Sequence, residues 1–196
     1  MKKLFYVLAV AMIVTACNQN TPETPEEQSK TAFVKATYFE ALGTNTVPNV
    51  EGENKDQPFS MDSVRVEAVI MTDTTLDINL YGINFSSKMP VTIDMVIPGA
   101  KYSRTSERIT LSGEGIIPTM GGNPFNRYVI NALAGSITAD SLVFTNSYGQ
   151  YAGCTYAGKI TKIEEKLWGI GEVFHQRERV RKGWFPMNPK RKNEYK

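Results

Sequence analysis

Between residues 33 and 163 the chain alternates apolar and polar residues with a period of two. In the stretch 64–70, for example, Val64 and Val66 flank Arg65. Successive side chains of a β-strand point to opposite faces, so this alternation predicts strands with one buried face. The pattern predicts eight strands, at residues 33–42, 64–70, 76–81, 91–97, 107–115, 127–138, 141–148 and 155–163.

The spacing of these strands predicts an all-β domain. They are short and close together, and no sustained helical stripe occurs before Ile163. Such spacing favours antiparallel neighbours, and Thr72-Asp73-Thr74 is a turn candidate that joins two of them into a hairpin. We expect an eight-stranded antiparallel meander barrel, because closure removes exposed strand edges. A β-sandwich explains the alternation nearly as well.

The first seventeen residues form an export signal. Lys2 and Lys3 precede an apolar run at 4–14, and Val14-Thr15-Ala16-Cys17 ends the segment. This order is typical of bacterial signal peptides. The run is too short to span a bilayer, which needs roughly 20 apolar residues. The last four residues resemble the lipobox of bacterial lipoproteins, which implies cleavage before Cys17 and a lipid on that cysteine. The alternative is an ordinary cleaved signal with an incidental cysteine.

Four regions follow from these patterns: a signal peptide at 1–16, a flexible tether at 17–32, the barrel domain at 33–167 and a basic C-terminal tail at 168–196. The tether is predicted because residues 18–31 hold no apolar residue beyond two prolines. Asn18 follows the cysteine. In enterobacterial lipoproteins Asp at that place favours retention in the inner membrane. The resemblance therefore implies the outer membrane of a Gram-negative bacterium, with the domain in the periplasm or on the cell surface.

Charge is spread unevenly along the chain. Residues 17–174 hold 12 Lys and Arg against 18 Asp and Glu, whereas residues 175–196 hold 8 against 2. Contacts to phosphates need a basic surface, so the acidic body argues against nucleic acid as a partner.

Several turn and strand motifs are similar to those of a known family. The motifs are INFSSKMPVTID at 83–94, VIPG at 96–99, LSGEGIIP at 111–118, GSI at 135–137 and DSL at 140–142. They resemble segments of the calycin-like β-barrel lipoproteins of anaerobic gut bacteria, over roughly residues 33–163. The resemblance implies a lipocalin-like barrel with eight antiparallel strands, and it supplies no binding residue.

The chain lacks the motifs of common catalytic and metal sites. One histidine excludes a two-histidine metal motif, and there is no C-x-x-C pair, Gly-x-Ser-x-Gly elbow or Walker sequence. We therefore expect no catalytic residue, no metal and no cofactor. Asp77 and Asp94 could act as an acid–base pair if they shared a cavity, but solvated acids on an outer face are the more frequent case. We interpret Cys154 as a small buried side chain.

Three serine or threonine residues are candidate modification sites. Ser63, Thr74 and Ser141 each follow an aspartate and precede an apolar residue or threonine. These runs resemble the acceptor of a general O-glycosylation system in some exported bacterial proteins. The alternative is that such residues cap turns through bonds to the backbone.

The main functional hypothesis is a binding module for a small hydrophobic ligand. An eight-stranded barrel can enclose one such ligand, and an apolar lumen suits a lipid or sterol. The same alternating residues could instead form a solid core. The candidate lining residues are Val64, Val66, Leu76, Ile78, Val91, Ile93, Met95, Tyr128, Ile130, Leu142 and Phe144.

The alternative function is a surface adhesion or assembly protein that binds a protein or glycan through its loops. The predicted irregular stretches at 43–61, 101–106 and 118–126 favour it, because loops on a rigid scaffold often bind partners. Tyr148, Tyr151 and Tyr156 could present rings to a sugar, although aromatic residues are also common at strand ends.

Overall fold

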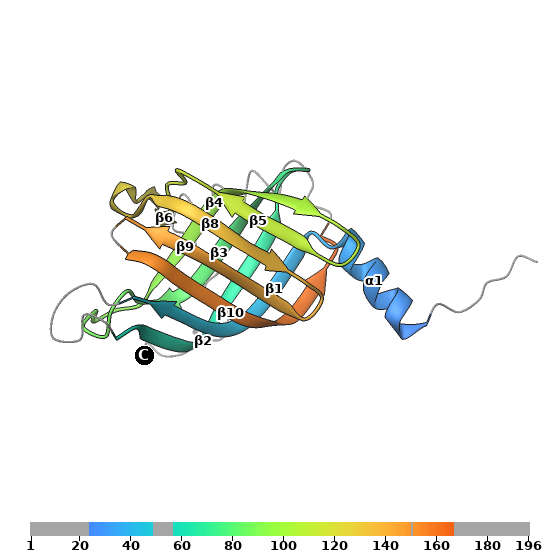
Figure 1. The fold of residues 1–196 in the computed structure, drawn as a ribbon, viewed down its shortest axis with the longest axis horizontal. Coiled ribbons are helices and arrows are strands. Elements are labelled where there is room, and N and C mark those ends of the chain that lie inside the picture. The colour runs from blue at the N-terminus through green and yellow to red at the C-terminus, as the bar shows by residue number, and fades with distance from the viewer. Residues whose placement is uncertain (1–23, 49–56, 150, 167–196) are drawn as a thin grey trace, which may run out of the picture.

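The described residues fold into a closed antiparallel β-barrel with one α-helix at its end (Figure 1). The computed structural model describes residues 24–48, 57–149 and 151–166. The predicted signal peptide, Cys17, the first residues of the predicted tether and the predicted basic tail lie outside them. The long strands are β1 (Tyr38–Val47), β2 (Phe59–Ile70), β3 (Thr75–Ile83), β4 (Ile93–Arg104), β5 (Ile109–Gly113), β8 (Ile130–Ile137), β9 (Ser141–Tyr148) and β10 (Tyr151–Glu164).

Each long strand pairs with its neighbour in the chain, and the sheet closes on itself. The order around the sheet is β3-β2-β1-β10-β9-β8-β5-β4, and β4 pairs again with β3. This closure confirms the predicted lipocalin-like barrel of eight antiparallel strands and excludes the sandwich. Two strands of two residues, β6 (Thr119–Met120) and β7 (Asn123–Pro124), and the 3₁₀ turn η1 (Asn126–Tyr128) lie in the connection from β5 to β8.

The strand boundaries differ from the sequence prediction in places. The prediction at 141–148 matches β9, whereas β4 begins at Ile93 and continues to Arg104. The irregular stretch expected at 101–106 is therefore mostly strand. Its residues pair with β5 from Lys101 to Arg104, and this pairing with a distant segment outweighs their polar composition.

An N-terminal helix replaces part of the predicted tether and the start of the predicted first strand. Helix α1 (Pro25–Lys35) begins after Thr24, whose hydroxyl accepts from Glu27 N over 3.4 Å. The Glu27 carboxylate accepts from Thr24 N over 3.2 Å, which completes a capping box. Proline at the first helical position favours the same start. The Thr-Pro-x-Glu sequence thus carried a helix signal that the lack of apolar residues obscured.

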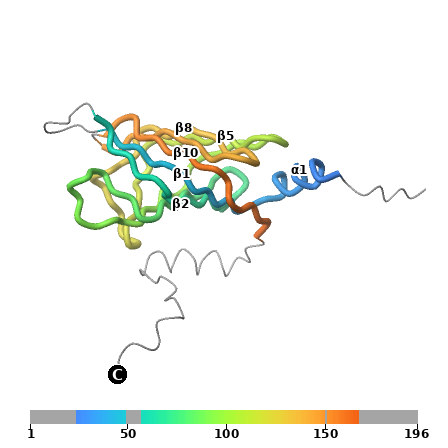
Figure 2. The backbone as a smooth tube through the Cα atoms, turned by 90° about the horizontal axis from the view of Figure 1, so that it is seen from below, coloured from blue at the N-terminus to red at the C-terminus, as the bar shows by residue number. Residues whose placement is uncertain are grey.

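The end of α1 is fastened to the barrel. Phe33 is buried and packs edge-to-face on Phe39, with ring centroids 5.6 Å apart. The guanidinium of Arg104 donates to the carbonyls of Val34 and Ala36 over 2.8 and 2.6 Å. These contacts hold the helix at one end of the barrel, from which it extends away into solvent (Figure 2). We call this the helix end.

The two ends of the barrel have different connections. At the helix end, Thr72, Thr105 and Thr138 each begin a tight turn, and each hydroxyl accepts from the backbone N three residues later over 3.0 to 3.1 Å. The hairpin predicted at 72–74 is among them and is confirmed. The opposite end, which we call the loop end, holds the connections β1–β2, β3–β4, β5–β8 and β9–β10.

Asp77 and Asp94 stabilise two irregularities between β3 and β4. Asp94 Oδ1 accepts from Gly82 N, and Asp77 Oδ1 accepts from Gly99 N, each over 2.8 Å. Both glycines have positive φ, of 67° and 68°, at places where the strand register shifts. A bulge leaves a backbone N–H without its hydrogen-bond acceptor on the neighbouring strand. Each carboxylate accepts the hydrogen bond of one such N–H instead. The two acids thus have separate structural roles.

Removing one of these carboxylates tests that role. We expect Asp94→Ala to lower the free energy of unfolding by about 1–2 kcal/mol, because a part-buried N–H loses a charged acceptor. Asp94→Asn keeps an acceptor oxygen and should lose less. Asp73→Ala, in an exposed turn, should change stability by about 0.5 kcal/mol at most. Urea unfolding measures all three, and equal losses for Asp94→Ala and Asp73→Ala would contradict the assignment.

A buried tyrosine spans three strands inside the barrel. The Tyr156 hydroxyl on β10 donates to the carbonyl of Val64 on β2 over 3.1 Å. Gly43 of β1 lies between them and pairs with both Val64 and Gly158. Because Gly43 and Gly158 have no side chain, the backbones approach closely and leave room for the ring.

Candidate functional site

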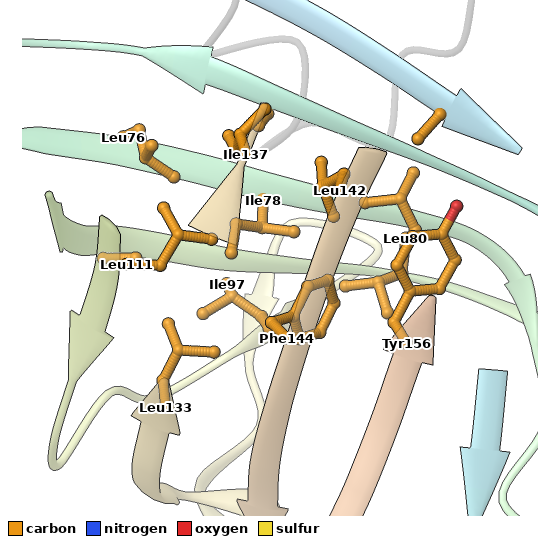
Figure 3. Packing of buried hydrophobic residues seen from close by; sticks show 14 of the residues in the cluster. Leu76, Ile78, Leu80, Ile97, Leu111, Leu133, Ile137, Leu142, Phe144 and Tyr156 are labelled. Carbon is orange, nitrogen blue, oxygen red and sulfur yellow. The ribbon is translucent and has the colours of Figure 1, made fainter. Parts of the chain in front are cut away.

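The centre of the barrel is filled by side chains. Figure 3 shows apolar residues of several strands meeting there. Eight of the eleven predicted lining residues have exposed fractions between 0 and 3 %. Side chains that line a hollow lumen would be exposed to the space inside it, so these residues form a packed core. These eight are Val64, Val66, Leu76, Ile78, Met95, Ile130, Leu142 and Phe144.

The other three predicted lining residues lie toward the loop end. Val91 is 63 % exposed and precedes β4, so its assignment to the interior is wrong. In the sequence, Val91 and Ile93 alternate with polar residues as in a strand. The segment that holds Val91, however, pairs with no other strand. Ile93 is half-buried against the core at the start of β4. Tyr128 belongs to η1 rather than to a strand, and its ring joins an aromatic cluster.

The aromatic cluster occupies the loop end and consists of Phe85, Phe125, Tyr128 and Tyr151. Its rings come from the β3–β4 connection, the β5–β8 connection and the start of β10. Phe85 and Phe125 stack on Tyr128 with centroids 4.8 and 4.7 Å away. Tyr151 lies 6.0 Å from Phe85 and 6.1 Å from Tyr128, and all four interplanar angles are 16° or less. Stacked rings of this kind form a rigid, largely apolar surface.

The cluster reaches from solvent into the barrel. Phe125, Tyr128 and Tyr151 are half-buried, whereas Phe85 is 7 % exposed. Below it, Tyr148 packs edge-to-face on Phe85 with centroids 5.4 Å apart. Of the three tyrosines considered for a sugar, Tyr148 and Tyr156 are buried and only Tyr151 can present its ring. The sequence could not identify the cluster, because alternation does not show which loops meet.

Cys154 lies inside the barrel near this cluster. It is buried, and its Sγ lies 3.6 Å from the carbonyl of Tyr151. Burial raises the pKa of the thiol to about 12, because the thiolate would lose its hydration. The thiol therefore stays protonated at neutral pH, which makes it a poor nucleophile.

The three candidate glycosylation sites differ in accessibility. Ser63 and Thr74 are exposed, and Ser63 lies at a bulge of β2 with a φ of 58°. Ser141 is half-buried, and its hydroxyl lies 3.0 Å from that of Thr138. The turn cap there is Thr138 rather than the aspartate. Ser63 and Thr74 therefore present the more accessible hydroxyl groups for modification.

The described residues contain no group of three or more His, Cys, Asp or Glu side chains arranged to hold a metal ion. Their helix, α1, is too short and too polar to cross a bilayer.

Comparison with known proteins adds one partial match. A family model described as a domain of unknown function, DUF4491, matches residues 129–191, which include β8 to β10 and much of the basic tail. No curated protein and no solved structure matches the chain.

Proposed function

We propose that the chain is a lipid-anchored lipoprotein of the cell envelope whose barrel presents its loop end to a protein or glycan partner. The position of the two ends of the barrel domain supports this proposal. Thr24 caps the start of α1, and the backbone N of Lys166 donates to Thr37 Oγ1 over 2.8 Å, so both ends of the barrel domain leave at the helix end. A lipid on Cys17, seven residues before Thr24, turns the helix end toward the membrane and the loop end away from it.

The packing of the barrel supports the same choice. A hydrophobic ligand at the centre would have to displace side chains that are already packed, so we place the binding site at the loop end. Tyrosine-rich aromatic clusters are frequent hot spots of interfaces, and a solid barrel holds them rigidly. The signal sequence and Asn18 favour the outer membrane of a Gram-negative bacterium, and we propose a binding role without catalysis.

Substitution of the exposed rings tests the loop end. We expect the double variant Phe125→Ala/Tyr151→Ala to recover its partner from envelope extract at least tenfold less well than the unchanged protein. The control Val34→Ala/Val143→Ala removes two exposed apolar side chains from the helix and the barrel wall and should recover it equally. Thermal unfolding verifies that both variants are folded. If both variants recover the partner equally well, the loop end is not the binding face.

A further inference from the structure

Two asparagine amides are buried on the inner face of the barrel near the loop end. Asn45 of β1 is 3 % exposed and Asn146 of β9 is 4 % exposed. The Nδ2 of Asn146 donates to the Tyr148 hydroxyl over 2.7 Å. Within the described part of the chain, the Asn45 amide makes no hydrogen bond and the Oδ1 of Asn146 accepts none. Among the described residues, Arg104 Nε is the one fully buried side-chain N or O atom without a hydrogen-bond partner. The free amide atoms of Asn45 and Asn146 are therefore not sealed from solvent, and they have hydrogen-bonding capacity left for a ligand.

Both amides lie one side chain away from the aromatic cluster. Asn146 contacts Tyr148, whose ring packs on Phe85. Asn45 pairs in register with Met61 of β2, and the Met61 sulfur accepts from the backbone N of the residue before Phe85 over 3.1 Å. Asn146 is thus linked to Phe85 through Tyr148, and Asn45 to the residue before Phe85 through Met61.

The surroundings of the amides are neutral. Asn45 pairs with Tyr156, and Asn146 pairs with Cys154, whose raised thiol pKa keeps it uncharged. A charged ligand group would meet no counter-charge from these side chains, and burying an unpaired charge is strongly unfavourable. The site therefore suits a neutral ligand that donates and accepts hydrogen bonds.

We propose that the loop end binds a neutral saccharide, whose hydroxyl groups bond to the amides of Asn45 and Asn146 while its C–H faces pack on the aromatic cluster. The proposal rests on the proposed function and narrows the partner to a glycan. An amide offers both a donor and an acceptor, which matches a hydroxyl group.

Asn45→Leu tests the site, with maltotriose, cellotriose and triacetylchitotriose as neutral probes in isothermal titration calorimetry. We expect at least one trisaccharide to bind the unchanged barrel at one site and to bind Asn45→Leu at least tenfold more weakly. The thermal midpoint of the free variant should stay the same or rise, because an apolar group replaces an amide without a partner. Asn131→Leu, exposed on β8, is the matched control and should bind normally.

Three results would overturn the proposal: no binding of any probe at millimolar concentration, equal binding by Asn45→Leu, or a lower midpoint for both Asn45→Leu and the smaller Asn45→Ala. The last result would show that the amide serves folding. If the saccharides fail while Phe125→Ala/Tyr151→Ala still loses its partner, the loop end binds a protein and the proposed function stands without the glycan.

Discussion

Gly43→Ala is expected to destabilise the barrel by about 3 kcal/mol or more, which is a large part of the stability of a domain of this size. A Cβ atom at Gly43 would overlap the carbonyl oxygen of Ala157 and the Cα of Gly158. Both are backbone atoms of β10, so the clash cannot be relieved by a change of rotamer. β1 and β10 would have to separate at the point where Tyr156 reaches across them.

Gly121→Ala separates this clash from the general effect of replacing a glycine. Gly121 has a φ of 55°, and a Cβ there would meet nothing within 4 Å. Its replacement should cost about 1–2 kcal/mol, from backbone strain alone. Guanidinium unfolding of both variants measures the difference. If Gly43→Ala is no less stable than Gly121→Ala, the close approach of β1 and β10 is wrong.

Raising the pH from 8 to 11 is expected to destabilise the folded protein strongly. Burial raises the pKa values of Cys154, Tyr148 and Tyr156 in the folded state. The unfolded chain releases these protons from about pH 8.5 for the thiol and about pH 10 for the phenols, while the folded chain keeps them. The folded state then binds more protons than the unfolded state, so stability falls as pH rises, by about 1.4 kcal/mol per pH unit for each such group. The free energy of unfolding should be about 6 kcal/mol lower at pH 11 than at pH 8.

Two spectra recorded along one alkaline titration test this expectation. Absorbance at 295 nm follows phenolate formation, and far-ultraviolet circular dichroism follows the sheet. We expect the buried tyrosines to ionise together with the loss of the sheet. Cys154→Ala should weaken the pH dependence between pH 8.5 and 10, where the thiol alone contributes. Complete ionisation near pH 10 with an intact sheet would contradict the burial of Tyr148 and Tyr156.

The strands were predictable because one local rule governs them. Side chains alternate between the two faces of a strand, so a segment with one buried face shows its pattern in sequence, as 141–148 does for β9. Val91 and Tyr128 show where the rule fails. Both continue an apolar pattern into a segment outside the long strands, and only the pairing partners define where a strand begins.

The candidate site could not be predicted from the sequence, because its residues are distant along the chain. Phe85, Phe125 and Tyr151 lie in separate connections that meet only when the barrel closes. The sequence around Asn45 and Asn146 does not distinguish them from polar residues on an outer face, because it does not show that they point into the barrel. Asp77 and Asp94 were interpreted as solvated acids on an outer face, because the bulge glycines that they bind come from the paired strand.

By itself, the sequence determined the all-β class, most strand positions and the hairpin at 72–74, because hydrophobic periodicity and turn chemistry act over a few residues. The tertiary structure decided the closure through β3 and β4, the packed centre and the opposite placement of helix end and loop end. These features depend on contacts between distant segments. A strand with one buried face has the same alternation in a barrel or a sandwich, and around a core or a lumen.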